Sequence, residues 1–126
     1  INTNLIYIKD KPNGRNINYK CGSLHLQSLI KKVKEKSADF GISFDGDGDR
    51  IICCDEKGKI IDGDKILAGL TQYFLCKSKL KINAMVGTTM SNRGLEKFIN
   101  RIGLKFYKSK VGDKFVYELM KKKIVL

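Results

Sequence analysis

The sequence has no apolar run that approaches the ~18 residues needed to cross a bilayer. It also shows no secretory signal peptide, because Asp10, Lys11 and Pro12 interrupt the first apolar stretch. We therefore expect a cytoplasmic protein without a membrane partner. With 42% hydrophobic and 30% charged residues, the composition is globular, and 126 residues suffice for one domain or for parts of two.

Arginine is scarce. The chain has 25 basic residues against 13 acidic ones, but only four of the basic residues are arginines. Arginine is the side chain best suited to reading bases and to clamping phosphates in two-point contacts. The lysines are spread along the chain, mostly on the outer faces of predicted helices. We therefore expect no nucleic-acid partner, despite the net charge of +12.

The usual zinc and disulfide patterns are missing as well. Cys21, Cys53, Cys54 and Cys76 form no CxxC pair, and Cys53 and Cys54 are neighbours that should point to opposite faces of a strand. We expect reduced, mostly buried thiols. His25 is the sole histidine and is expected to be structural or exposed, so a mechanism with a histidine base would have only this candidate.

What is present is an alternation of strands and helices. Apolar runs predict strands at 5–8, 40–44, 50–54, 59–61, 82–86 and 104–108. Apolar residues at helical spacing predict helices capped by Ser23, Ser91 and Asp113, and another helix from about Asp64. Their expected inner faces are Leu26, Leu29, Ile30 and Val33, then Ile66, Leu67, Leu70, Tyr73 and Phe74, then Leu95, Phe98, Ile99 and Ile102, and finally Val116, Tyr117, Leu119 and Met120. The alternation predicts an α/β fold.

A charged link at 77–81 divides the chain into two such units. Each unit has few elements for a complete layered domain, and residues 124–126 resemble the start of an unfinished strand. The first residue is also Ile1 rather than Met. These features predict that the sequence is a piece of a longer protein.

The most informative stretch follows the predicted strand 40–44 and reads Asp45-Gly46-Asp47-Gly48-Asp49-Arg50. Alternate residues of an extended segment share a face, so the three carboxylates can converge. Their mutual repulsion, roughly 1–4 kcal/mol per pair near a protein surface, is removed by a hard divalent cation. Oxygen ligands with open positions suit Mg²⁺, and Arg50 adds a cationic fork suited to a phosphate oxygen. The loop therefore predicts a magnesium site that handles phosphate.

Two other interpretations of the loop remain. Asp45, Asp47, Asp49 and Glu56 occupy positions 1, 3, 5 and 12 of an EF-hand calcium loop, but Arg50 stands where that loop needs glycine and the flanks predict strands. The other interpretation is an acidic surface turn without a ligand.

A similar order of short motifs occurs in the α-D-phosphohexomutase superfamily. Residues 38–50 resemble the metal-binding loop of that superfamily. Further stretches resemble its bacterial phosphoglucosamine mutase branch, namely 12–18 with 21–23, 62–64, 86–88 with 90–92 and 94–96, and 110–114 with Val116. The resemblance runs in order along nearly the whole chain.

The resemblance implies an architecture and a reaction. Members have four domains around a deep cleft, and the first three are α/β units with mixed sheets flanked by helices. By resemblance, residues 1–78 are the later part of the second domain, with the metal-binding loop, and residues 79–126 are the earlier part of the third. The reaction interconverts glucosamine 6-phosphate and glucosamine 1-phosphate through a phosphoserine and a bisphosphate intermediate, and supplies cell-envelope precursors.

The resemblance also implies roles for individual residues. Asp45, Asp47 and Asp49 match the three protein ligands of Mg²⁺, and Arg50 matches a residue placed beside the transferring phosphate. Lys110 matches a substrate-contacting residue of the third domain that assists proton transfer. Arg50 and Lys110 are thus the expected catalytic residues, and the substrate is a phosphorylated hexosamine.

Three functional parts of the family have no counterpart in this sequence. They are the phosphoserine loop, the sugar-selecting loop of the third domain and the phosphate-binding loop of the fourth. We therefore expect these 126 residues to be inactive alone and to work with the remaining domains of a full-length mutase. Two alternatives stay open: a segment of a phosphomannomutase or phosphoglucomutase, and a non-catalytic Mg²⁺-binding remnant.

Overall fold

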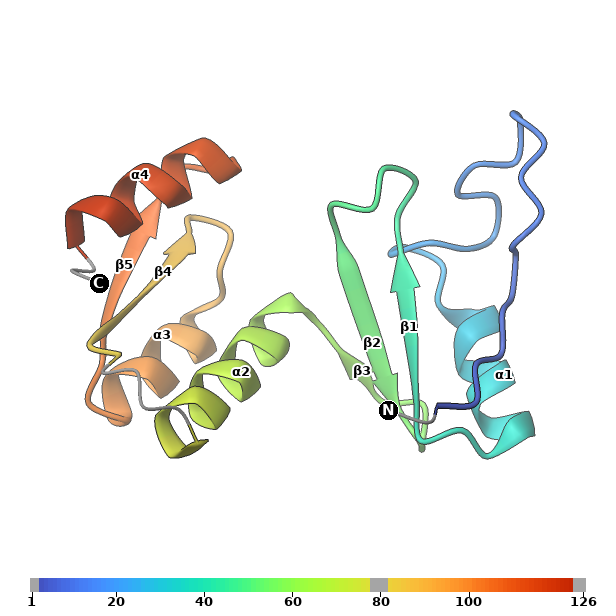
Figure 1. Cartoon of the computed structure of the whole chain (residues 1–126), viewed down its shortest axis with the longest axis horizontal. Coiled ribbons are helices and arrows are strands. Elements are labelled where there is room, and N and C mark those ends of the chain that lie inside the picture. The colour runs from blue at the N-terminus through green and yellow to red at the C-terminus, as the bar shows by residue number, and fades with distance from the viewer. Residues whose placement is uncertain (1–2, 78–81, 124–126) are drawn as a thin grey trace. The chain divides into compact units, whose positions relative to one another are not determined.

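A computed structural model describes residues 3–77 and 82–123, and the chain divides into two compact units, Ile1–Gly63 and Asp64–Leu126 (Figure 1). The first unit contains α1 (Gln27–Lys36), β1 (Phe40–Phe44), β2 (Ile51–Asp55) and β3 (Ile60–Ile61). The second contains β4 (Ala84–Thr88), α3 (Arg93–Arg101), β5 (Lys105–Ser109) and α4 (Asp113–Lys123), preceded by α2 (Gly63–Lys77). The predicted boundary at 78/79 lies outside the described residues and stays a prediction.

The first unit is an antiparallel sheet, in the order β1-β2-β3, with α1 packed on one face. Leu29 and Val33 of α1 are buried against Cys54 of β2. Gly41 of β1 permits this close packing, because a Cβ there would lie 2.7 Å from Val33 Cγ2, 2.9 Å from Leu29 Cδ1 and 3.0 Å from Cys54 Sγ. Cys53, on the other side of the strand, is only half-buried, which confirms that the two neighbouring thiols face opposite ways.

The other face of this sheet is apolar and exposed. Phe40, Ile42 and Phe44 of β1 alternate with the residues that face α1, and the strand register places Ile51 opposite Phe44. These four side chains are 58%, 42%, 57% and 38% exposed in that order. The sheet thus has one packed face and one water-facing apolar face.

Two predictions for the first unit are wrong. Residues 5–8 form no strand, because a strand needs a neighbour to satisfy its backbone groups and the pairings of the described sheet join only β1, β2 and β3. Ser23 does not cap α1, because it lies in a turn that the His25 N–H closes by donating to the Gly22 carbonyl. The helix begins at Gln27 without a side-chain cap. His25 itself is exposed, as expected.

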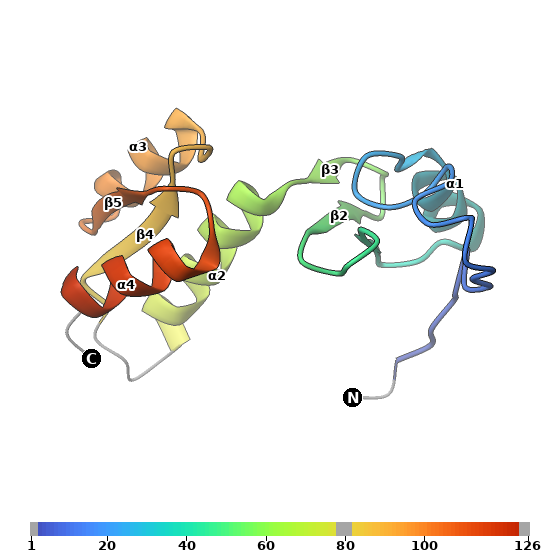
Figure 2. The same cartoon turned by 90° about the horizontal axis from the view of Figure 1, so that it is seen from above.

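The second unit is built on the parallel pair β4–β5, with helices on both faces (Figure 2). Met85 and Phe106 face the core of α3, where Leu95 and Ile99 are buried. On the opposite face, the Lys123 ammonium of α4 lies 5.5 Å from the centroid of the Tyr107 ring. This layering confirms the predicted strand–helix alternation for 82–123.

The cap of α3 is one residue away from its predicted position. Asn92 rather than Ser91 caps the helix, since its Oδ1 accepts the Leu95 N–H at 2.9 Å. Ser91 instead uses its hydroxyl oxygen to accept the Thr88 N–H at 3.2 Å. Serine and asparagine both cap helices well, and the conformation of the loop after β4 puts Asn92 at the cap position.

The predicted inner faces of α2 and α4 are wrong in part. In α2, Leu67, Leu70, Tyr73 and Phe74 are exposed and Ile66 is half-buried, whereas Thr71 is the buried residue. Ala68 of this helix packs against the core formed by Leu95, Ile99 and Leu104. In α4, Val116 and Leu119 are half-buried but Tyr117 and Met120 are exposed, and the predicted strand start at 124–126 lies outside the described residues.

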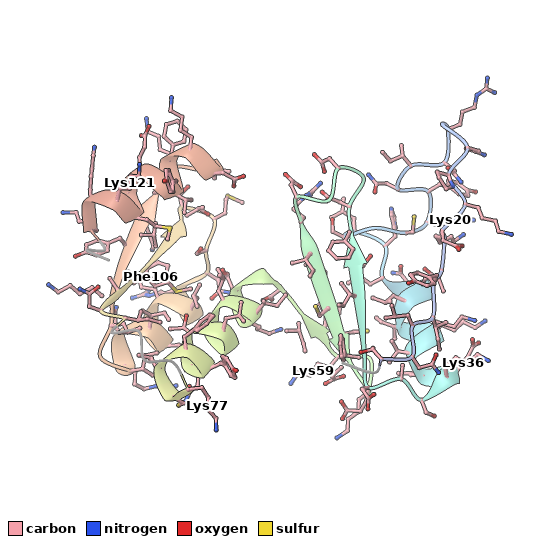
Figure 3. All side chains as sticks on the ribbon, in the orientation of Figure 1. Lys20, Lys36, Lys59, Lys77, Phe106 and Lys121 are labelled. Atoms are coloured by element: carbon pink, nitrogen blue, oxygen red, sulfur yellow. The ribbon has the colours of Figure 1, made fainter. Side chains whose placement is uncertain are left out.

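Surface charge follows the prediction. Lys20, Lys36, Lys59, Lys77 and Lys121 are all exposed and point outward from their units (Figure 3). No helix in the described parts of the chain is both long and apolar enough to span a membrane.

Candidate metal centre

The acidic loop is the tight connection between β1 and β2. Phe44 and Ile51 form the last cross-strand pair, and inside it the Asp45 N–H donates to the Arg50 carbonyl at 3.4 Å. The Gly48 N–H donates to the Asp45 carbonyl at 3.2 Å, and Gly48 has a φ of +72°. Such a φ favours glycine, which explains why this residue stands at the sharpest part of the turn.

The three aspartates converge as the sequence predicts. Each offers one carboxylate oxygen, and these oxygens all lie within 4.8 Å of one another. Asp45 is buried, with only 3% of its side chain exposed, whereas Asp47 and Asp49 are exposed. The site therefore has one fixed carboxylate at its base and two that solvent reaches.

Arg50 is bonded to the buried carboxylate. Its Nε lies 2.5 Å from Asp45 Oδ2, and its backbone N–H donates to Asp45 Oδ1 at 3.1 Å. A second, longer ion pair joins Nε to Asp49 Oδ1 at 3.5 Å, while 61% of the Arg50 side chain remains exposed. Arg50 therefore orients the base of the site as well as carrying positive charge at its rim.

These contacts shift the pKa values of Asp45 and Asp49 in opposite directions. Burial acts to raise the pKa of Asp45, but hydrogen bonds from the backbone and side chain of Arg50 outweigh it and hold that pKa below its usual range. The pKa of Asp49 is raised, first by its hydrogen bond with Asp45, then by partial desolvation and by the charge of Asp47. The hydrogen bond to Asp45 raises the pKa of Arg50. Of these two carboxyl groups, Asp49 is therefore the one that takes up a proton first.

The donor set fits a hard divalent cation. All three donors are carboxylate oxygens, the ligand type that Mg²⁺ and Ca²⁺ prefer, and their spacing lets one ion meet all three. An EF-hand is excluded, because the loop is flanked by the strands β1 and β2 rather than by helices. Glu56, its twelfth position, lies beyond β2 in the turn before β3.

The thiols do not belong to this site. Cys53 and Cys54 have pKa values raised by burial, and Cys76 is exposed in the second unit. The expectation of mostly buried thiols is correct for Cys54, but Cys21 and Cys53 are half-buried and Cys76 is exposed on α2.

Lys110, the other predicted catalytic residue, lies in the second unit just after β5. Its side chain is exposed, and its ammonium lies 5.9 Å from the centroid of the Phe115 ring. The preceding Ser109 is buried at the end of β5, where its hydroxyl lies 2.8 Å from the Lys110 carbonyl and 3.2 Å from the Gly87 carbonyl, and its own carbonyl accepts the Thr89 N–H at 3.0 Å. The loop that carries Lys110 is therefore tied to β4.

One hydrogen bond in the second unit joins residues that are far apart in the sequence. Asp64 Oδ2, in the first turn of α2, accepts the Asn92 N–H at the start of α3, at 2.8 Å. The Met90 N–H in the same loop donates to Thr88 Oγ1 at 3.2 Å. These bonds fix the loop after β4, and 28 residues of separation hide the Asp64–Asn92 contact from local pattern analysis.

Family comparisons match both units in order. Residues 4–58 match the family described as phosphoglucomutase/phosphomannomutase, alpha/beta/alpha domain II, and residues 62–126 match its alpha/beta/alpha domain III. The chain belongs to the phosphoglucomutase/phosphomannomutase family, and the predicted α/β class with two consecutive domains of this type is confirmed.

Individual relatives are more specific. The chain is 49% identical over 123 residues to a phosphoglucosamine mutase of Nautilia profundicola, covering 98% of this chain and 28% of the relative. It is 51% identical over 118 residues to one of Thermodesulfovibrio yellowstonii, covering 94% and 26%. A crystal structure of a phosphoglucomutase/phosphomannomutase family protein from Burkholderia thailandensis matches with a TM-score of 0.66 at 27% identity, covering 77% of this chain and 21% of that one. The resemblance to phosphoglucosamine mutases is thus confirmed, over about a quarter of their length.

Proposed function

We propose that this chain is part of a phosphoglucosamine mutase, an isomerase that interconverts glucosamine 6-phosphate and glucosamine 1-phosphate. The observation that carries the proposal is the convergence of Asp45, Asp47 and Asp49 at the end of β1. Two phosphoglucosamine mutases are 49% and 51% identical to this chain over 98% and 94% of its length. These names favour glucosamine phosphate over mannose or glucose phosphate as the substrate.

Mg²⁺ is the proposed cation of the acidic loop. When bound, it supplies charge neutralisation and polarisation of the transferring phosphoryl group. Asp45, Asp47 and Asp49 would each hold it through a carboxylate oxygen. Arg50 keeps the buried carboxylate oriented, and its exposed guanidinium would donate to a phosphate oxygen of the substrate.

The remaining roles are proposed by family likeness. Lys110 would contact the substrate and assist proton transfer, since it is an exposed cation on a loop tied to β4. The phosphoserine and the sugar-selecting and distal phosphate loops would come from the rest of the full-length mutase. Four free cysteines support a reducing compartment, and we place the enzyme in the cytoplasm.

The test uses the intact gene product that contains this sequence. Asp47→Asn removes one of three ligand charges, so Mg²⁺ affinity measured by calorimetry should fall by about tenfold or more, and isomerase activity should fall with it. Glu56→Gln is the matched control, because it removes one carboxylate of the same unit outside the cluster and should change neither value.

Three results would overturn parts of this proposal. Equal titration heats for wild type and Asp47→Asn would remove the metal assignment. Faster turnover of mannose or glucose phosphates than of glucosamine phosphate would change the substrate. Mg²⁺ binding without any isomerase activity would identify a non-catalytic remnant.

A further inference from the structure

The loop of residues 13–20 packs directly against the acidic loop. A Cβ placed on Gly46 would lie 2.5 Å from Ile17 Cδ1 and 2.7 Å from Ile17 Cγ1, with Asn18 Nδ2 at 3.0 Å. The two distances to Ile17 are shorter than non-bonded carbon atoms can approach, so the end of the Ile17 side chain occupies the space that a Cβ at position 46 would take. Gly46 stands between the ligands Asp45 and Asp47, which places Ile17 against the backbone that joins them.

Local hydrogen bonds stabilise the 13–20 loop. The Asn16 side chain accepts the Asn13 N–H at 3.0 Å and donates to the Lys11 carbonyl at 2.9 Å. The Tyr19 N–H donates to the Asn16 carbonyl at 3.1 Å. These bonds give the Ile17 side chain a fixed support.

A second contact joins Gly22, just after this loop, to the end of β1. Gly22 is buried, and a Cβ there would lie 2.7 Å from Asn18 Oδ1 and 3.5 Å from the Phe44 carbonyl oxygen. Residues 17–22 therefore follow the chain from Phe44 to Gly46. The first metal ligand, Asp45, lies between these two points of contact.

The two glycines of the acidic loop differ in their surroundings. A Cβ on Gly48 would meet no atom within 4 Å, and Gly48 is needed for its φ of +72°. Gly46 is not among the positive-φ residues of the described chain, so its backbone would accept alanine. A Cβ at position 46 would instead displace the end of the Ile17 side chain.

We infer that Ile17 is a positioning residue of the metal site. It packs on Gly46 and so restrains the backbone between two ligands, which keeps three mutually repelling carboxylates converged before a cation arrives. A site held in its binding geometry loses less freedom on binding and therefore binds more tightly. This inference rests on the proposed metal site, and it concerns a residue that is itself 69% exposed and not a ligand.

The test is a double-mutant cycle in the intact gene product, with Mn²⁺ as a calorimetric probe alongside Mg²⁺. Ile17→Ala should weaken metal affinity by about tenfold, the low end of the range for residues that orient metal ligands. Gly46→Ala should weaken it also, because the new methyl group collides with Ile17 Cδ1. The double variant should bind more tightly than Gly46→Ala alone, since the smaller residue at 17 makes room.

Control measurements separate positioning from general stability. Ile17→Val keeps the branched contact and should bind nearly as wild type. Leu24→Ala removes another exposed apolar side chain of the same unit, at 78% exposure, and should leave metal affinity unchanged. Thermal unfolding in EDTA should be nearly the same for wild type, Ile17→Ala and Leu24→Ala, because both side chains are largely in water.

The outcomes are distinguishable. Wild-type affinity in Ile17→Ala, or a double variant no better than Gly46→Ala, would overturn the positioning role while leaving the metal site intact. A loss of EDTA-state stability in Ile17→Ala equal to its loss of metal affinity would overturn it too. No metal binding by wild type would overturn the proposed function itself, and this inference with it.

Discussion

Two glycine-to-alanine substitutions should change stability in opposite directions. At Gly41 in β1, a new Cβ would lie within 3.0 Å of side-chain atoms of Val33, Leu29 and Cys54. Overpacking of this kind costs about 1–3 kcal/mol, because the packed helix α1 must shift away from the sheet. At Gly69 in the middle of α2, a Cβ would meet nothing within 4 Å, so alanine should stabilise the helix by roughly 0.5–1 kcal/mol.

The assay is urea unfolding of the 126-residue chain, followed by far-UV circular dichroism at several protein concentrations. Gly41→Ala should lower the free energy of unfolding and Gly69→Ala should raise it, with little change in the urea dependence. Both substitutions add the same methyl group, so backbone and packing effects are compared on equal terms. A neutral or stabilising Gly41→Ala would refute the close packing of α1 on β1.

Three further predictions follow from the site and its supports. Metal affinity should weaken as the pH falls from neutral, and the weakening should begin at a pH above the usual pKa of an aspartate. The reason is that the raised pKa of Asp49 lets a proton compete with the metal ion for this carboxylate. In Asp49→Asn, metal affinity measured against pH should change less. Asp64→Ala should speed hydrogen exchange of the Asn92 amide and cost about 1 kcal/mol, whereas Asp64→Asn, which keeps an acceptor oxygen, should have a smaller effect; equal exchange in all three would contradict the tie. The 126-residue chain alone should show no isomerase activity, and measurable turnover would show that its own residues suffice for the reaction.

The acidic loop could be predicted from sequence because its information is local. Alternating Asp and Gly after an apolar strand predict a turn, and alternate residues of an extended segment share a face, so the local pattern was enough to predict that the carboxylates converge. The burial of Asp45 and its bonds to Arg50 could not be predicted, since they depend on how the loop closes. The pattern located the carboxylates but not the difference in acidity between Asp45 and Asp49.

The fold predictions were wrong where the local structure depends on contacts with residues that are distant in the sequence. Leu5 to Ile8 has the composition of a strand, but strand formation depends on a neighbour, which sequence composition does not report. In α2 the apolar residues surround much of the helix, so hydrophobic spacing could not identify Thr71 as the buried position. The contact of Ile17 with Gly46 was missed for a similar reason, because it joins two loops that no periodicity connects.

The exposed face of the first sheet has a consequence for solution measurements on this chain. Phe40, Ile42, Phe44 and Ile51 form one contiguous apolar surface across β1 and β2. Surfaces of this kind favour association, because burying them releases ordered water. Folding of the 126-residue chain would then be coupled to association, and the midpoint of unfolding would rise with protein concentration. A free energy of unfolding measured at one protein concentration would then include the free energy of association as well as that of folding.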